Sequence, residues 1–291
     1  MDLCQARQRP PKILCVLSRA VTKHGANPAA KIVWFLFDNS IKSYEKRDPA
    51  MKAVHSGDSA LRSAEFRENR SPRAILMNML LAAVSLFVNG FGVYLTIQAN
   101  IGAGPWDVLN LGISKTFGVL YGNASIAVSL TILFIDILLR EPIGIAMFID
   151  AVVVGKAVDF FNWIGLVPPC SSLWTGVPVL LTGLVILAYT QYTYMLASLG
   201  CGPRDTLLVG LARRAKSIPI GAVSVALLSS ATLIGWLLHG PVGVGTLLCA
   251  FGAGPIMQLA FRSVHFDATG IRHQRLKDSL RVFFPHRQTT A

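Results

Sequence analysis

Four long stretches of the chain contain no Asp, Glu, Lys or Arg: 74–106, 116–135, 160–203 and 217–261. A helix that crosses the hydrocarbon core of a bilayer needs about 20 mostly apolar residues. Glycines and prolines divide the apolar body of the chain into segments of that length, so the sequence predicts an all-α polytopic membrane protein. We expect about six transmembrane helices, at 75–98, 121–139, 142–163, 173–197, 221–238 and 241–261.

Charge is sparse and lies mainly at the two ends of the chain. Only 14% of the residues are charged, against about 25% in a soluble protein. The net charge of +12 divides into +7 for 1–74, +1 for 75–261 and +4 for 262–291. Basic residues that flank apolar segments are typical of the cytoplasmic side of a membrane protein, whereas a nucleic-acid binder gathers them on a folded surface.

These charges define the expected ends and partners of the protein. We expect a disordered basic cytoplasmic segment at 1–73 and a basic cytoplasmic tail at 263–291. The expected partners are the lipid bilayer, anionic lipid at both basic termini and further copies of the chain in a homo-oligomer, but no nucleic acid.

An octapeptide occurs twice in the chain. Residues 102–109 read GAGPWDVL and residues 200–207 read GCGPRDTL. Further matches recur at a spacing of 98 or 99 residues, among them Tyr94 with Tyr192. The sequence therefore predicts an internal duplication.

The two predicted units are membrane repeat 1 at 74–165 and membrane repeat 2 at 170–262. Each contains three expected spans. Because three is odd, the second copy must cross the membrane in the opposite sense to the first. Many secondary transporters have this inverted arrangement and bind their solutes near the membrane midplane.

Each octapeptide has the composition of a helix interruption followed by a new helix. Glycine accepts backbone angles that other residues avoid, and proline suits the first helical position. A carboxylate in the first turn interacts favourably with the helix dipole. The stretch 105–117 is too short to span a bilayer, so we expect a re-entrant half-helix or an interfacial helix there.

Two interpretations of the octapeptides remain open. In one, they are helix stop–start signals and the aspartates are caps. In the other, the two helix starts converge and bind a solute or an ion. The candidate binding residues in the octapeptides are Gly102, Gly104, Pro105, Asp107, Gly200, Gly202, Pro203 and Asp205.

The third expected span carries three charged residues, and an ionisable group at membrane depth is costly enough to suggest a function. Lys156 and Asp159 are three residues apart on one helix face, so we expect a structural charge pair. Asp150 has no partner at such a spacing and is a further candidate for substrate or ion binding. Asp136 lies four residues before Arg140, which predicts a pair at the end of the second span.

The apolar body of the chain, about 75–261, resembles a known family. The segments GAGPWDVLNLGISKTFGVLYGNASIAV and EPIGIAMFIDAVVVGKAVDFF resemble the YczE/YitT-type integral membrane proteins of bacteria, and GCGPRDTLLVGLARRAKSIPIGAVSVA repeats the pattern. The resemblance implies a multi-pass protein of the bacterial cytoplasmic (inner) membrane with five or six spans, whose N- and C-termini we expect in the cytoplasm. The chain departs from it at Lys156, where the second copy has proline, and in the segment 1–72.

No recognisable active-site motif occurs in the sequence, such as HExxH or a phosphate loop. We therefore expect no enzymatic activity, no cofactor and no metal. The preferred hypothesis is a permease-like protein that moves a small solute of unidentified kind. The alternative is a structural or regulatory membrane protein that transports nothing and acts through a protein partner.

Overall fold

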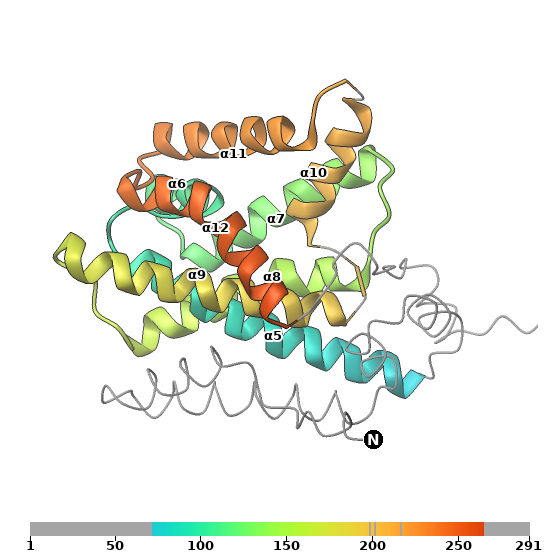
Figure 1. Ribbon diagram of the computed structural model, residues 1–291, viewed down its shortest axis with the longest axis horizontal. Coiled ribbons are helices and arrows are strands. Elements are labelled where there is room, and N and C mark those ends of the chain that lie inside the picture. The colour runs from blue at the N-terminus through green and yellow to red at the C-terminus, as the bar shows by residue number, and fades with distance from the viewer. Residues whose placement is uncertain (1–71, 198, 201, 216, 265–291) are drawn as a thin grey trace, which may run out of the picture.

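The computed structural model describes residues 72–264 except 198, 201 and 216, and all regular elements in these residues are helices (Figure 1). The predictions for the N-terminal segment and the C-terminal tail lie outside the described residues. The helices are α5 (Pro72–Gln98), α6 (Pro105–Phe117), α7 (Tyr121–Leu138), α8 (Ile145–Ile164), α9 (Leu173–Leu196), α10 (Pro203–Arg214), α11 (Ile220–Leu237) and α12 (Val244–Ser263).

Every expected span contains a helix. Among the described helices, α5, α7, α9, α11 and α12 are long and apolar enough to cross a membrane. The remaining expected span corresponds to α8, which has 20 residues but carries the three charges noted above. Pro142 and Pro241 precede α8 and α12 by three residues. Both prolines therefore lie in the turns before these helices and not at the first helical position.

The centre of the structure is the pair α5 and α9, which lie side by side (Figure 1). They run antiparallel, because Asn89 donates to Thr190 (2.9 Å) while the backbone of Ala99, ten residues later, lies beside Gly176. Their backbones approach closely where Gly92 meets Gly183: a Cβ added at Gly183 would lie 2.8 Å from the Gly92 carbonyl oxygen. Small residues at such a crossing let membrane helices pack by van der Waals contact.

The other helices surround this pair in two groups. Helix α8 packs on α5 and helix α12 packs on α9, while α6 packs on α11 and α10 packs on α7. Contacts of α7 with α8 join the two groups. Both short helices therefore lie between longer helices.

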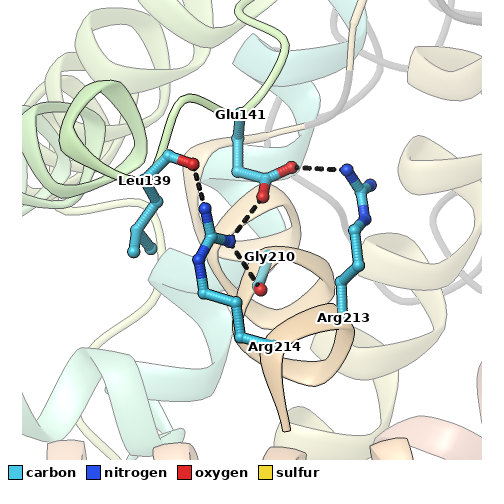
Figure 2. Close-up of polar contacts among 5 residues, drawn as sticks. All are labelled: Leu139, Glu141, Gly210, Arg213 and Arg214. Carbon is cyan, nitrogen blue, oxygen red and sulfur yellow. Dashed lines mark hydrogen bonds and ion pairs between the residues drawn. The ribbon is translucent and has the colours of Figure 1, made fainter. Parts of the chain in front are cut away.

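The ends of α6 and α10 are anchored to turns that lie far away in the sequence. At the end of α6, the Thr116 hydroxyl donates to the carbonyl oxygen of Leu238 (3.0 Å). At the end of α10, the Arg214 guanidinium donates to the carbonyl oxygen of Leu139 and to a carboxylate oxygen of Glu141 (2.7 Å) (Figure 2).

Glu141 is the centre of this second anchor. Its side chain is only 3% exposed and lies between Arg213, at 3.3 Å, and Arg214 (Figure 2). A buried carboxylate is tolerated only when it is paired and hydrogen-bonded. The anchor therefore fixes the carboxyl end of α10 against the turn between α7 and α8.

The expected pair of Asp136 with Arg140 is wrong. The Asp136 side chain is fully buried, and neither of its carboxylate oxygens has a hydrogen-bond partner among the described residues. Arg140 lies beyond the helix end, in a backbone conformation with φ of 54°. The chain has left helical geometry at Arg140, so the spacing of four residues no longer puts the two side chains on one face.

We predict that Glu141→Gln lowers the free energy of unfolding by about 1–3 kcal/mol, because two arginines lose their buried counter-charge. Arg213→Gln is the matched comparison and should cost at most about 1 kcal/mol, since Arg213 is 64% exposed and exposed ion pairs contribute little. Thermal unfolding in detergent measures both, and equal losses would contradict the prediction.

Candidate functional site

The two octapeptides have matching backbone angles at their glycines. Gly102 and Gly200 have φ of 111° and 128°, in a region that residues with a Cβ rarely adopt. The N-caps Gly104 and Gly202 then have nearly identical angles, with φ of −59° and −62°. The short helices begin at the prolines, as predicted.

Each interruption is closed by backbone from a turn in the other half of the chain. Gly245 donates its N–H to the carbonyl oxygen of Ile101 (2.7 Å), and Ala103 donates to Pro241 (3.3 Å). In the second interruption, Ala146 donates to the carbonyl oxygen of Leu199 (3.4 Å). Three backbone groups of the interruptions, the Ile101 and Leu199 carbonyl oxygens and the Ala103 N–H, are thus paired within the protein.

The first-turn aspartates do not act as side-chain caps. Neither α6 nor α10 has a side-chain hydrogen bond at its cap. Instead Asp107 accepts a hydrogen bond from the Tyr121 hydroxyl (2.7 Å), and Asp205 accepts one from the Gln191 amide (3.2 Å). Both carboxylates therefore accept a hydrogen bond from a side chain of another helix.

A polar cavity of about 150 Å³ lies where these carboxylates face. Helices α5 to α10 all contribute to its lining, at positions within the helices for α5, α7 and α8 and at the first turns of α6 and α10. The polar lining consists of three carboxylates, one guanidinium and neutral hydroxyl and amide groups: Asp107, Asp150, Asp205, Arg204, Tyr121, Tyr194, Ser125, Ser129, Asn89 and Gln191.

Asp150 and Asp205 face each other beside Gly202. A Cβ added at Gly202 would lie 3.2 Å from one Asp150 oxygen and 3.9 Å from an Asp205 oxygen. Glycine at this position therefore leaves space between the two carboxylates. In the described part of the chain, no side chain or backbone group donates a hydrogen bond to Asp150.

Arg204 brings a positive charge into the same cavity. Its guanidinium carbon lies 5.3 Å from the ring centroid of Trp106, a distance typical of a cation–π contact. Trp106 and Arg204 stand at the same position of the two octapeptides, one of the three positions at which the two copies differ. The octapeptides therefore touch at one of the positions at which they differ.

The predicted residues divide into two sets. Of the nine candidates for binding, Asp107, Asp150, Gly202 and Asp205 line the cavity. The other five, which shape the backbone beside it and are absent from its lining, are Gly102, Gly104, Pro105, Gly200 and Pro203.

The predicted charge pair of α8 is confirmed. Lys156 lies 3.9 Å from Asp159 and also donates to Asn123 of α7 (2.7 Å). Asp159 in turn accepts the N–H of Gly122 (2.8 Å). These contacts join α7 to α8 away from the cavity.

Most of the neutral lining, and also Arg204, was not predicted from the sequence. Ser125 belongs to the recurring pattern, since Ser224 stands at the same place in the second unit, but Gln191 and Asn89 lie in apolar spans and had no motif around them. The mismatch of Trp106 with Arg204 inside a matching octapeptide was the one available signal for the arginine.

Comparison with known proteins identifies a family for the chain. Residues 76–262 match the model of a family described as a family of unknown function (DUF6198). The chain belongs to this family. The resemblance to YczE-type proteins is confirmed as well, because the chain is 31% identical over 178 residues to the "Uncharacterized membrane protein YczE" of Bacillus subtilis, covering 60% of this chain and 81% of that protein.

Two further relatives extend the comparison. An "Uncharacterized protein" of Haemophilus influenzae is 30% identical over 182 residues, which cover 62% of this chain and 81% of the relative. The "Uncharacterized protein YyaS" of Bacillus subtilis is 25% identical over 189 residues, covering 63% of this chain and 92% of the relative. No solved structure matches the chain significantly. The family and the apolar helices together identify an integral membrane protein in contact with the lipid bilayer.

We predict that Gly102→Ala and Gly200→Ala each destabilise the protein by about 1–3 kcal/mol, because the new Cβ is strained at positive φ and meets backbone. It would lie 2.7 Å from the Gly243 nitrogen in the first case and 2.9 Å from the Gly144 Cα in the second. The matched control is Gly118→Ala, where φ is 66° and a Cβ meets nothing within 4 Å.

The control should cost only about 1 kcal/mol, the strain of the left-handed conformation alone. Thermal unfolding in detergent compares the three variants. A loss at Gly118 as large as those at the octapeptide glycines would show that the contact with the opposing turn is unimportant.

Proposed function

We propose that the protein is a permease that moves a small solute by alternating access. The observation that carries the proposal is the polar cavity within the apolar helices, lined by the first turns of both interrupted segments. Charged groups are expensive at membrane depth and characteristically mark the pathways of substrates and ions. Discontinuous helices with half-helix starts directed at a midplane site are a recurring feature of secondary transporters.

The proposal includes the two inverted repeats at 74–165 and 170–262. Helices α5 and α9 correspond at the spacing of 98 residues and run antiparallel, which supports opposite orientation of the two units. Most helix contacts of one unit also have a counterpart in the other. Helix α5 packs on α8 as α9 packs on α12, and α6 packs on α11 as α10 packs on α7. A single duplicated unit related by an approximate two-fold axis accounts for these matches.

Individual contacts follow the same exchange. Thr116 with Leu238 corresponds to Arg214 with Leu139, at spacings of 98 and 99 residues. The close approach of Gly102 to Gly243 corresponds in the same way to that of Gly200 to Gly144. Agreement at this level supports the repeat more strongly than helix order alone.

One contact breaks the exchange. In the first unit, α7 and α8 pack closely, and a Cβ at Gly155 would lie 2.8 Å from the Gly122 carbonyl oxygen. The corresponding glycines of the second unit, Gly221 and Gly254, have nothing within 4 Å of an added Cβ. Helices α11 and α12 diverge from the turn that joins them (Figure 1).

This asymmetry supports alternating access. We call a unit closed when its third and fourth helices pack together, as α7 and α8 do, and open when they are apart, as α11 and α12 are. If the two units exchange conformations, this state has the first unit closed and the second open, and the other state has the reverse. The cavity would then open to opposite sides of the membrane in the two states, as in transporters that rock one repeat against the other.

We propose that the side containing Arg140, Arg213 and Arg214 is cytoplasmic, in the cytoplasmic membrane of a bacterium. Arg213 and Arg214 pair with Glu141 (Figure 2), and Arg140 directly precedes Glu141 in the chain. Positive charge is enriched on the cytoplasmic side of membrane proteins. The same proposal assigns the protein no enzymatic activity. Contact of the basic termini with anionic lipid and assembly into a homo-oligomer stay predictions.

A second candidate function is that of a structural or regulatory membrane protein acting through a protein partner. The observation in its favour is the exposure of α11, of whose most apolar window only 11% is buried within the protein, against 50% for α7. A partner helix packed between α11 and α12 would hold the two apart permanently. This alternative predicts no solute flux and tolerance of Asp150→Asn.

We predict that proteoliposomes containing the protein move at least one solute from a panel of small cations, anions and neutral compounds, and that Asp107→Asn and Asp205→Asn reduce this flux by about tenfold or more, a loss of about 1.4 kcal/mol. Asp58→Asn, a matched change before the first expected span, should leave the flux unchanged. Absence of flux for the whole panel, or flux indifferent to both site variants, would refute the proposal.

We also predict that two equivalent cysteine pairs can be crosslinked in turn. Asn123→Cys with Lys156→Cys joins α7 to α8, and Ala222→Cys with Pro255→Cys occupies the corresponding positions of α11 and α12. In a background without the five native cysteines, a short bifunctional thiol reagent should link either pair, and each link should stop transport.

A link in the first pair should also prevent a link in the second, because the units cannot both be closed. Mass spectrometry of the linked peptides measures this. If the second pair never reacts, the separation of α11 and α12 is permanent and the alternating mechanism is wrong.

A further inference from the structure

The cavity has a size that limits its occupant. Its volume of about 150 Å³ equals that of a cavity known to hold benzene in an unrelated protein, so it accommodates about six non-hydrogen atoms. A solute of this size would contact α7, α8 and α10 simultaneously. This inference rests on the proposed function in taking the cavity as the solute site.

The charge of the cavity selects the sign of the occupant. In their ionised forms, Asp107, Asp150 and Asp205 contribute three negative charges, and Arg204 contributes one positive charge. The amino ends of α6 and α10 add about half a positive charge each. The remaining charge is about −1, which a single positive charge on a solute would neutralise.

The arrangement of the carboxylates argues against a bare metal ion as the occupant. Within the described part of the chain, no group of three His, Cys, Asp or Glu side chains is placed to hold one metal ion. Asp107 is moreover directed to Tyr121, while Asp150 lies across Gly202 from Asp205. Carboxylates that are spread around a cavity suit a cation that extends over several atoms.

Neutral acceptors for such a cation line the same space. Ser125 and Ser129 are 3% and 4% exposed and lie one turn apart on α7, and both line the cavity. Among the described residues, neither hydroxyl takes part in a hydrogen bond. Buried polar groups are normally hydrogen-bonded, so two hydroxyls that face the cavity without a protein partner are free to accept from a polar occupant.

Arg204 has the geometry of an internal counter-cation. Its guanidinium lies over Trp106, and no carboxylate of the described residues is within ion-pair distance of it. It therefore lowers the net negative charge of the cavity without forming an ion pair with a described carboxylate. Asp150 stays available to a cation that enters.

We propose that the cavity binds a small monovalent organic cation, an amine or a guanidine of about six non-hydrogen atoms, through Asp150 and Asp205 with Ser125 and Ser129 as neutral partners. Arg204, held on Trp106, balances the remaining negative charge and weakens the binding enough for release.

Binding of a named probe tests the proposal directly. Methylguanidinium should raise the melting temperature of the purified full chain in detergent by about 3–6 °C at about ten times its Kd. N-Methylurea has the same number of non-hydrogen atoms without the charge, and acetate carries the opposite charge. Neither should produce a shift at the same concentration.

Two variants of opposite charge effect make the test independent of folding losses. Asp150→Asn should weaken methylguanidinium binding by about tenfold or more, and Arg204→Gln should strengthen it by a similar factor. An anion site would show the reverse order. Asp159→Asn, the same change on α8 away from the cavity, should bind the probe like the unmodified protein, and Asp150→Glu should restore binding if Asp150→Asn folds poorly.

The outcomes separate this proposal from the proposed function. Methylguanidinium binding that follows the predicted order, without flux in proteoliposomes, upholds the cation site and refutes the permease. Flux of neutral or anionic solutes only, with no probe binding, upholds the permease and refutes the cation site. Equal shifts from methylguanidinium and N-methylurea, or a stronger effect of Asp159→Asn than of Asp150→Asn, also overturn the cation site.

Discussion

The structure depends on one constraint: lipid cannot hydrogen-bond to a broken helix, so each break must be paired within the protein. The helices are interrupted before Pro105 and before Pro203, and backbone groups from the other half of the chain form hydrogen bonds to each interruption. The Gly245 N–H reaches Ile101 and the Ala146 N–H reaches Leu199. Each half therefore pairs part of the backbone that the other half's break exposes.

The same constraint creates the cavity. The helices that follow the breaks, α6 and α10, begin beside the cavity, so the carboxylates of their first turns line it. Asp107 and Asp205 then bond to Tyr121 and Gln191 on neighbouring helices. The interruptions that leave backbone groups without a helical partner therefore also place charged side chains at the cavity.

The sequence predicted the helices well and the site in part. The length of the uncharged apolar stretches and the positions of glycine and proline located all eight described helices, because these signals act locally along the chain. Asp107, Asp150 and Asp205 were recognisable because a charge in an apolar span is conspicuous. Gln191, Asn89 and the serines were not, because neutral polar residues are common in spans and only the packing of α5, α7 and α9 brings them together. The pairing of Asp136 with Arg140 failed because it assumed that the helix continues past its turn.

The contact of Trp106 with Arg204 has a consequence for the form of the chain. In the proposed repeat arrangement, the two residues stand at equivalent positions of the two units, and they contact each other. Two identical subunits assembled in the same way would bring tryptophan against tryptophan or arginine against arginine. Joining the copies in one polypeptide allows the two positions to differ, so the single covalent chain can hold one lone positive charge at its centre, which a symmetric assembly could have only in pairs.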